Sequence, residues 1–365
     1  MASPPIGLDI TSSALVAVSL KRKGKGYGVV ARAESPLQPG IVVDGEVHDP
    51  DALAAAVKAF WVEHGFKDRN VAIGVANQRC ITRVIEKVRI KGSKKALREA
   101  LSFDVAEHLP ITLEEAIWDF HTVGKWKHEE TGADMERHVV VMVYRESVER
   151  YRDALVLAGL KPVRIDLAAF ALMRAGLPAV KIARAAGDDE AGEEQAVALL
   201  DIGPTSTNVV ISRGDICELN RIVAFGRQHY TQTLVDHFGW ETEDAERVTI
   251  EAGIIPLGGV EVPGDPYADS RRILQFVTEQ FAQEIRTSFD YYSHSTNGAH
   301  RVGRVIIAGE GARLRGIAQR FASELGMPAS ILDSSPLLDS ASVEELGGDQ
   351  ARFGTALGLA MERAA

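Results

Sequence analysis

Cysteine is scarce in this 365-residue chain, which contains only Cys80 and Cys217. Because the two lie far apart and have no partners at metal-ligand spacing, they predict neither a disulfide framework nor a zinc site, and they suit a reducing compartment. Positive charge is not in excess either. The formal net charge is −10 and the isoelectric point is near 5.6, which argues against a general nucleic-acid-binding protein, since such a protein needs a basic surface.

Long apolar runs are also missing. Residues 1–7 contain no apolar signal region, and no window is as long and apolar as a transmembrane helix. We therefore expect a cytoplasmic protein that meets a membrane only through a partner. The chain lacks a Walker A motif, a Gly-x-Ser-x-Gly elbow and a His-Glu-x-x-His motif, and its ten histidines are scattered. These absences argue against the common ATPase, hydrolase and zinc-peptidase chemistries.

What the chain does contain is 45% hydrophobic residues, enough for a buried core, in a length that suits two lobes. The first part predicts a helix that begins after Asp49, with Pro50 in its first turn, and ends at Gly65. This helix lies among strands predicted over residues 6–10, 14–20, 27–34 and 71–76.

Residues 80–160 are predicted to form a separate small unit. Its first helix is capped by Ser93 and its second by Ser147. A charged loop over residues 125–137 separates two strand-like segments, residues 117–123 and 138–144. The order helix, strand, strand, helix is typical of an α+β module.

The remaining elements follow the hydrophobic periodicity of the sequence. Strands are predicted over residues 163–166, 196–202, 209–212 and 304–308. Helices are predicted over residues 168–175, 228–238, 242–252, 269–295, 314–325 and 353–361. The alternation of strands and helices indicates an α/β protein.

The most informative feature is an internal duplication. Residues 7–13 and 200–207 each form an apolar strand that ends near an aspartate, followed by a hydroxyl-rich turn and another apolar strand. Backbone N–H groups and hydroxyls in such a turn can bind a phosphate, and the aspartate is placed to hold a hydrated divalent cation. Either copy alone is more often a plain hairpin turn. Two copies half the chain apart indicate two similar lobes that grip one nucleotide.

A third element covers residues 305–314, where a strand is followed by a glycine-rich turn that enters a helix. Its glycines would let the backbone approach an adenosine closely. The alternative is that the glycines serve only the tight packing of the strand against the helix.

In this order of elements the chain resembles the actin-like ATPase superfamily. Within it, the sequence is similar over nearly its whole length to the PilM family of type IV pilus assembly proteins, relatives of the cell-division protein FtsA. The most specific stretches are ALREALSFDVAEHLP at 96–110, AGLKPVRID at 158–166, AE at 245–246 and GTALGLA at 354–360. The first stretch is diagnostic of an inserted subdomain that PilM and FtsA carry and that actin and sugar kinases lack.

The resemblance implies an α/β, actin-like (ribonuclease H-like) duplicated two-lobe fold with an inserted α+β subdomain. The implied domains are a first lobe at 1–79, completed by 161–183 and 345–365, an inserted FtsA/PilM-type subdomain at 80–160, and a second lobe at 184–344 with a helical subdomain at about 226–299.

The resemblance also assigns a site. Asp9 and Asp201 would face Mg²⁺ through water, and Asp166, at the start of the first link between the lobes, is the candidate catalytic residue. The nucleotide-binding candidates are Asp9, Thr11, Ser12, Ser13, Asp201, Gly203, Thr205, Ser206, Thr207, Glu246, Gly309 and Gly311. Judged from the residues alone, Asp166 could equally cap its helix, and Glu246 could be a solvated helix residue.

The implied function is a cytoplasmic, nucleotide-binding scaffold of a type IV pilus or related secretion machine, peripheral at the inner membrane. Its cofactors would be ATP or ADP with Mg²⁺. Its main partner would be a PilN-like single-span inner-membrane protein, whose N-terminal tail binds beside the inserted subdomain. The family also suggests assembly ATPases of the machine and further copies of the chain as partners. An actin-fold small-molecule kinase and an FtsA-like filament-forming protein stay open as alternatives.

The chain departs from the family pattern at three places. It has Gly309-Glu310-Gly311 where the family usually has Gly-Gly-Gly or Ser-Gly-Gly, and Thr249 where a lysine is common. Pro204 stiffens the second phosphate turn and removes one N–H donor. Because each change weakens nucleotide binding or hydrolysis, we expect at most a slow ATPase.

Overall fold

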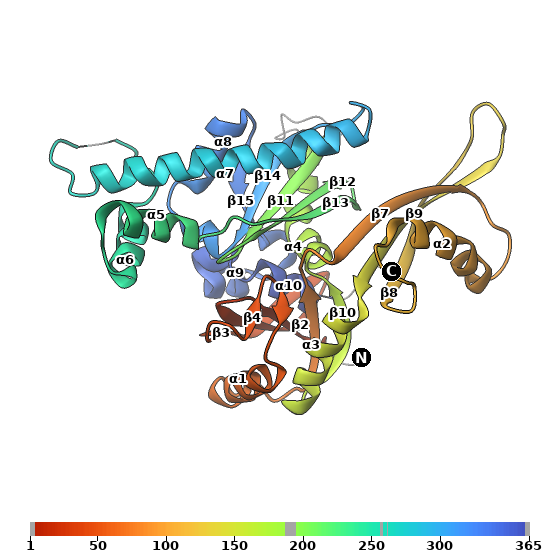
Figure 1. Ribbon diagram of the computed structural model, residues 1–365, viewed down its shortest axis with the longest axis horizontal. Helices are drawn as coiled ribbons and strands as arrows, with labels where there is room; N and C mark the ends of the chain where they lie inside the picture. Colours follow the sequence, from red (N-terminus) through yellow and green to blue (C-terminus); the bar gives the residue numbers. More distant parts are fainter. Residues whose placement is uncertain (1–3, 187–194, 256–257, 261, 362–365) are drawn as a thin grey trace.

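A computed structural model describes residues 4–186, 195–255, 258–260 and 262–361. Two five-stranded sheets form the body of the molecule, and a three-stranded sheet projects from one side (Figure 1). The predicted domain ranges also include residues 1–3, 187–194, 256–257, 261 and 362–365, which lie outside the described residues.

The first sheet has the strand order β10-β6-β1-β2-β3. Strand β1 pairs antiparallel with β2 and parallel with β6, and β6 pairs parallel with β10. All of β1 except its aspartate is buried, as expected for a strand covered on both faces. The strands are β1 (Ile6–Ile10), β2 (Ala14–Lys23), β3 (Gly26–Pro36), β6 (Asn70–Val75) and β10 (Lys161–Leu167).

The second sheet repeats this arrangement, with the order β13-β12-β11-β14-β15. Strand β11 pairs antiparallel with β12 and parallel with β14, just as β1 pairs with β2 and β6. The duplication predicted from the two aspartate turns is therefore confirmed. The strands are β11 (Ala196–Ile202), β12 (Thr207–Arg213), β13 (Ile216–Val223), β14 (Val302–Gly309) and β15 (Ala329–Ile331).

Two helices of small residues join the lobes. Helix α4 (Ala168–Ala186) follows β10, and α10 (Gly354–Ala360) lies between α4 and β1. A Cβ on Gly358 would lie 1.8 Å from the carbonyl oxygen of Ala171 in α4, and a Cβ on Gly7 would lie 2.0 Å from that of Ala356 in α10. Glycine is required at both places because any side chain would push α10 away.

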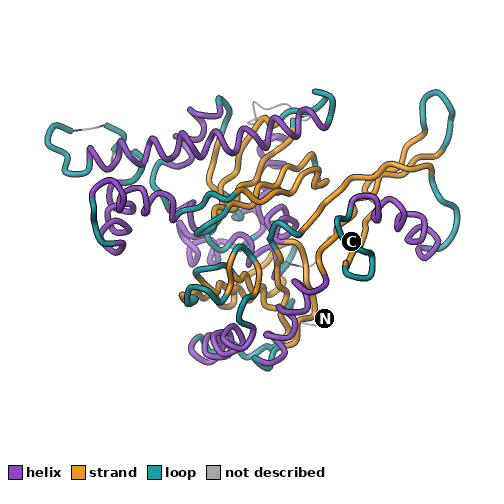
Figure 2. The backbone as a smooth tube through the Cα atoms, viewed as in Figure 1, coloured by secondary structure: helices purple, strands orange, loops and turns teal. Residues whose placement is uncertain are grey.

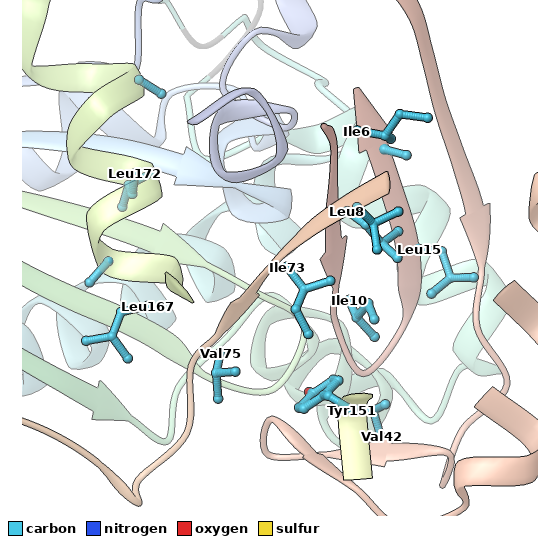
Figure 3. Packing of buried hydrophobic residues seen from close by; sticks show 14 of the residues in the cluster. Ile6, Leu8, Ile10, Leu15, Val42, Ile73, Val75, Tyr151, Leu167 and Leu172 are labelled. Atoms are coloured by element: carbon cyan, nitrogen blue, oxygen red, sulfur yellow. The ribbon is translucent and has the colours of Figure 1, made fainter. Parts of the chain in front are cut away.

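Helices α1 (Pro50–Glu63) and α3 (Arg145–Leu157) pack in the core of the first lobe, together with the short hairpin β4 (Val42–Val43) and β5 (Glu46–Val47). Figure 3 shows Tyr151 of α3 beside side chains of the first sheet. The carboxylate of Asp49 accepts a hydrogen bond from the N–H of Ala52 at 2.9 Å, so the predicted cap is confirmed. The helix ends at Glu63, two residues before Gly65, whose φ is +66°.

The projecting sheet has the order β7-β9-β8, and α2 (Lys94–His108) packs against it over a small core of its own. Ser93 caps α2 as predicted. Figure 2 shows how far its long strands extend from the body. The strands are β7 (Cys80–Val88), β8 (Ala116–Lys127) and β9 (Asp134–Tyr144).

Two predictions for this region are wrong. Most of the predicted loop over 125–137 is strand, since β8 and β9 continue as a paired ribbon as far as Lys127 and Asp134. Ser147 does not cap α3, which begins at Arg145. Its hydroxyl instead donates to the two carboxylate oxygens of Glu46 at 3.0 and 2.9 Å. Strand β7 was not predicted from the sequence.

The second lobe carries the helices α5 (Gln228–Phe238), α6 (Thr242–Ala252), α7 (Ala268–Ser295) and α8 (Ile317–Leu325). The predicted bounds of α5 and α6 agree with the structure, and α7 begins one residue earlier than predicted. Helix α8 begins at Ile317, later than predicted. The preceding residues form a 3₁₀ turn (Glu310–Arg313), and Gly316 then adopts a left-handed conformation that a helix cannot include. Strands β13 and β15 and helix α9 (Ser340–Leu346) were not predicted.

The division of the chain into domains stays a prediction. One observation bears on it: residues of α3, which falls inside the predicted insert at 80–160, lie in the core of the first lobe, namely Tyr151, Ala154 and Leu155.

Candidate functional site

Asp9 and Asp201 occupy equivalent positions near the ends of β1 and β11. Burial, and then the nearby Asp201 carboxylate, raise the pKa of Asp9 to about 7, and Arg352 opposes this shift. Burial also raises the pKa of Asp201, while Arg352 and the hydroxyl of Thr355, which donates to Asp201 Oδ2 at 2.7 Å, lower it. Two carboxylates that repel each other fit the needs of Mg²⁺, which takes one or two carboxylates together with water and phosphate oxygens.

The first predicted phosphate turn is closed by Thr11. Its Oγ1 accepts a hydrogen bond from the N–H of Ala14 at 3.0 Å and donates to the carbonyl oxygen of Ala14 at 3.1 Å. Ser12 is half-buried in the same turn. The hydroxyl of Ser13 donates to Glu310 Oε2 at 3.3 Å, so this turn reaches across to the second lobe.

The second predicted phosphate turn is closed by a backbone hydrogen bond. The N–H of Gly203 donates to the carbonyl oxygen of Ser206 at 2.9 Å. Thr205 and Ser206 are half-buried at the surface of the turn. Thr207 is fully buried, and its hydroxyl donates to the carbonyl oxygen of Phe225 at 2.6 Å. Thr207 therefore anchors the strand, while Thr205 and Ser206 are the more accessible hydroxyl residues of the turn.

The two glycines of the third element contact β11 closely. Gly309 has a φ of +79°, and a Cβ on it would lie 2.3 Å from Asp201 Oδ1. A Cβ on Gly311 would lie 2.3 Å from Cγ2 of Ile202. Both glycines are thus required by packing within the chain. Their contact with adenosine stays a prediction.

Asp166 lies at the end of β10, buried and tied to the two joining helices. Its Oδ2 accepts a hydrogen bond from Arg174 of α4 at 2.8 Å, and its Oδ1 accepts from the N–H of Leu167 at 3.0 Å. Arg174 Nε also donates to the carbonyl oxygen of Gly358 in α10 at 2.9 Å. This arrangement holds α4 against α10. The catalytic role of Asp166 stays a prediction.

Two arginines that the sequence patterns did not indicate lie at the site. Arg227 pairs with Glu246 at 2.5 Å and with Glu310 at 2.9 Å. Arg352, almost fully buried, pairs with Glu34 of β3 at 2.7 Å. Arg227 follows a glycine just before the helix predicted over residues 228–238, and this pattern could have marked it as a candidate anion-binding residue. Arg352 precedes an apolar helix, and no motif marks it.

The sequence matches a family model described as type IV pilus assembly protein PilM, over residues 7–364. The chain belongs to this PilM family. The match spans both lobes and the projecting sheet, so the resemblance drawn from short motifs is confirmed.

Solved structures agree. A chain of the PilM-PilN type IV pilus biogenesis complex is 25% identical, with a TM-score of 0.76, and the match covers 98% of this chain and 97% of that one. The ethanolamine utilization protein EutJ from Carboxydothermus hydrogenoformans matches at 16% identity and a TM-score of 0.56, over 99% and 90% of the two chains. MreB 5 of Spiroplasma citri bound to AMPPNP matches at 14% identity and a TM-score of 0.50, over 98% and 95%. The predicted actin-like fold is confirmed.

These matches do not favour a small-molecule kinase or an FtsA-like filament as the function of the chain. Within the described ranges, no helix is long and apolar enough to cross a membrane. Nor do three or more His, Cys, Asp and Glu side chains gather into a metal site in the part of the chain that the structure describes.

Proposed function

We propose that this PilM-family chain is a nucleotide-binding scaffold of the type IV pilus assembly platform, at the cytoplasmic face of the inner membrane. Its partner in this proposal is the N-terminal tail of a PilN-like single-span membrane protein. The observation that carries the proposal is the end-to-end match to a chain of the PilM-PilN complex, which includes the projecting sheet as well as both lobes.

The nucleotide in this proposal is ATP or ADP with Mg²⁺, held between the two aspartate turns. The support is the electrostatic interaction between the Asp9 and Asp201 carboxylates, together with the half-buried Ser13, Thr205 and Ser206 in the turns that follow their strands. The fold is shared with a protein bound to AMPPNP. Chemically, Mg²⁺ would relieve the repulsion between the two carboxylates, and the protein's own residues would bind and orient the phosphates.

The tail-binding region in this proposal is the projecting sheet and the junction at its base, where Cys80 of β7 and Val143 of β9 enter the core of the first lobe. Strand β8 is one edge of the three-stranded sheet, and β7, at the other edge, runs close to β13 of the second lobe. An extended peptide can add to an exposed edge strand through main-chain hydrogen bonds. A short tail would bind weakly because its ordering costs entropy that a small interface must offset.

The test removes the projection and keeps the body. Ile81 and Met142 face each other in the β7–β9 ladder, so residues 82–141 can be replaced by Asn-Gly, a sequence that favours a tight hairpin. Cys80 and Val143, which contribute to the first-lobe core, stay in place. Melting curves would establish that this variant folds.

Binding of a fluorescently labelled PilN-like tail peptide is then measured by anisotropy. We expect the hairpin variant to lose peptide binding. The control is a double alanine variant of Phe276 and Tyr291, exposed residues of α7, which should bind as the wild type does. Undiminished binding by a folded hairpin variant would place the interface elsewhere and overturn this part of the proposal.

A further inference from the structure

Arg227 lies where the three predicted nucleotide-binding elements meet. Its N–H donates to the carbonyl oxygen of Gly203 at 2.9 Å, and the N–H of Gln228 donates to that of Pro204 at 2.8 Å. A Cβ on Gly226 would lie 2.6 Å from the oxygen of Gly203, so the segment is pressed against the second phosphate turn. The position of Arg227 is therefore fixed by the backbone of that turn.

The guanidinium of Arg227 is held between two carboxylates. Its Nε donates to Glu310 Oε1 at 2.9 Å, and a terminal nitrogen donates to Glu246 Oε1 at 2.5 Å. The second oxygen of Glu310 accepts the hydrogen bond from Ser13 of the first lobe. The side chains of Arg227 and Glu310 are 13% and 18% exposed, whereas that of Glu246 is 44% exposed. One continuous chain of polar contacts thus crosses from the first lobe to the second.

Charge in this chain of contacts is unbalanced. One guanidinium lies between two carboxylates, which leaves a net negative charge beside the place where a nucleotide's phosphates are expected. Glu310 also occupies the two donors, Ser13 and Arg227, that a phosphate would use, because a carboxylate and a phosphate accept the same charge-assisted hydrogen bonds from arginine. Glu310 lies between the two glycines of the third element, Gly309 and Gly311.

We propose that Arg227 is a phosphate-binding residue of this chain, and that Glu310 is an internal carboxylate that competes with the nucleotide's phosphates for Arg227 and Ser13. The inference rests on the proposed nucleotide binding and specifies its ligands. Nucleotide entry breaks the bonds of Glu310 to Arg227 and Ser13, while Glu246 keeps the guanidinium oriented. Glu310 thereby lowers the affinity of the site.

The proposal predicts shifts of opposite sign when the two ends of one ion pair are changed. Glu310→Gln removes the competing charge and should tighten binding of ADP with Mg²⁺ about tenfold, equivalent to about 1.4 kcal/mol. Arg227→Gln removes a phosphate ligand and should weaken binding about tenfold or more. If the Arg227–Glu310 pair only stabilised the second lobe, both substitutions would break the same contact and shift affinity in the same direction.

The measurement is calorimetric titration of the full chain with ADP and ATP in the presence of Mg²⁺, and with inorganic pyrophosphate as a phosphate-only probe. Arg247→Gln is the matched control, since Arg247 neighbours Glu246 on α6 but is 57% exposed and pairs with Asp244. Glu310→Ala is the second variant, in case the glutamine keeps both hydrogen bonds. Melting curves verify that each variant is folded.

The expected result is tighter binding by both Glu310 variants, weaker binding by Arg227→Gln, the same order for pyrophosphate, and no change for Arg247→Gln. Equal affinities for the wild type and both Glu310 variants, or shifts of one sign, would overturn this inference and leave the proposed nucleotide binding intact. Absence of binding by the wild type and every folded variant would overturn the proposed nucleotide binding itself.

Discussion

Replacing Asp9 with asparagine should make the nucleotide-free protein more stable at neutral and higher pH. In the native state burial and the Asp201 carboxylate raise the pKa of Asp9 from 3.8 to about 7. The native state thus holds a proton on Asp9 at pH values where the unfolded chain has lost it. The stability associated with this proton is present below about pH 4 and is lost as the pH rises toward 7.

The magnitude follows from the shift. A rise from 3.8 to about 7 corresponds, at 1.36 kcal/mol per pH unit, to at most about 4 kcal/mol lost between acidic and neutral pH. Asparagine carries no charge to desolvate and does not repel Asp201. The free energy of unfolding of Asp9→Asn minus that of the wild type should therefore be small near pH 4 and grow until about pH 8.

The assay is urea unfolding followed by circular dichroism at several pH values from 4 to 8, without nucleotide or Mg²⁺. Asp119→Asn is the control, since this carboxylate is exposed on the projecting sheet and pairs loosely with Arg98 at 3.6 Å. A difference between Asp9→Asn and the wild type that stays flat across this range would refute the reasoning. So would a variant that becomes less stable than the wild type as the pH rises.

Other predictions concern the packing of α10, the cap of α1 and the rate of ATP hydrolysis. Gly358→Ala should destabilise the protein by about 3 kcal/mol or more because α10 must move away from α4, whereas Gly348→Ala, which has no atom within 4 Å of the added Cβ, should leave the melting temperature unchanged. Asp49→Ala should cost about 1 kcal/mol of unfolding free energy, since it removes the cap of α1. Phosphate release from ATP should be slower than about 1 per second, and robust multiple turnover without a partner would contradict this.

Much of the architecture could be predicted because it is repeated. The two aspartate turns lie half a chain apart, and each is flanked by apolar strands, so a two-lobe arrangement follows from local pattern alone. The equivalence of Asp9 and Asp201 follows from the same symmetry. Helices α5 and α6 were predicted because their amphipathic periods are clear.

The strands over residues 117–123 and 138–144 were predicted, but the outer part of the β8–β9 ribbon was not, because it is rich in charge. Lys127 pairs with Asp134 at 3.1 Å, and Arg89 and Lys125 both reach Glu136 at 3.5 Å. Such cross-strand ion pairs support a projecting ribbon that has little core behind it. In the sequence the same charges are typical of a loop.

The contacts among Ser13, Arg227 and Glu310 could not be predicted from the sequence for a different reason. Glu310 lies 83 residues from Arg227 and 297 from Ser13. The fold of the second lobe brings Arg227 to Glu310, and the contact between the lobes adds Ser13. The sequence indicated Glu310 as a departure from the family. It gave no indication that Arg227 would pair with Glu310.

We propose that the projecting sheet and the junction at its base receive the tail of a membrane partner. Hydrogen–deuterium exchange of the full chain, with and without a PilN-like N-terminal tail peptide, tests this directly. We expect slower exchange on peptide binding in β7, β8 and β9 and at the junction with the first lobe, and little change in α7. Protection confined to α5, α6 and α7 of the second lobe, with the projecting sheet unchanged, would contradict it.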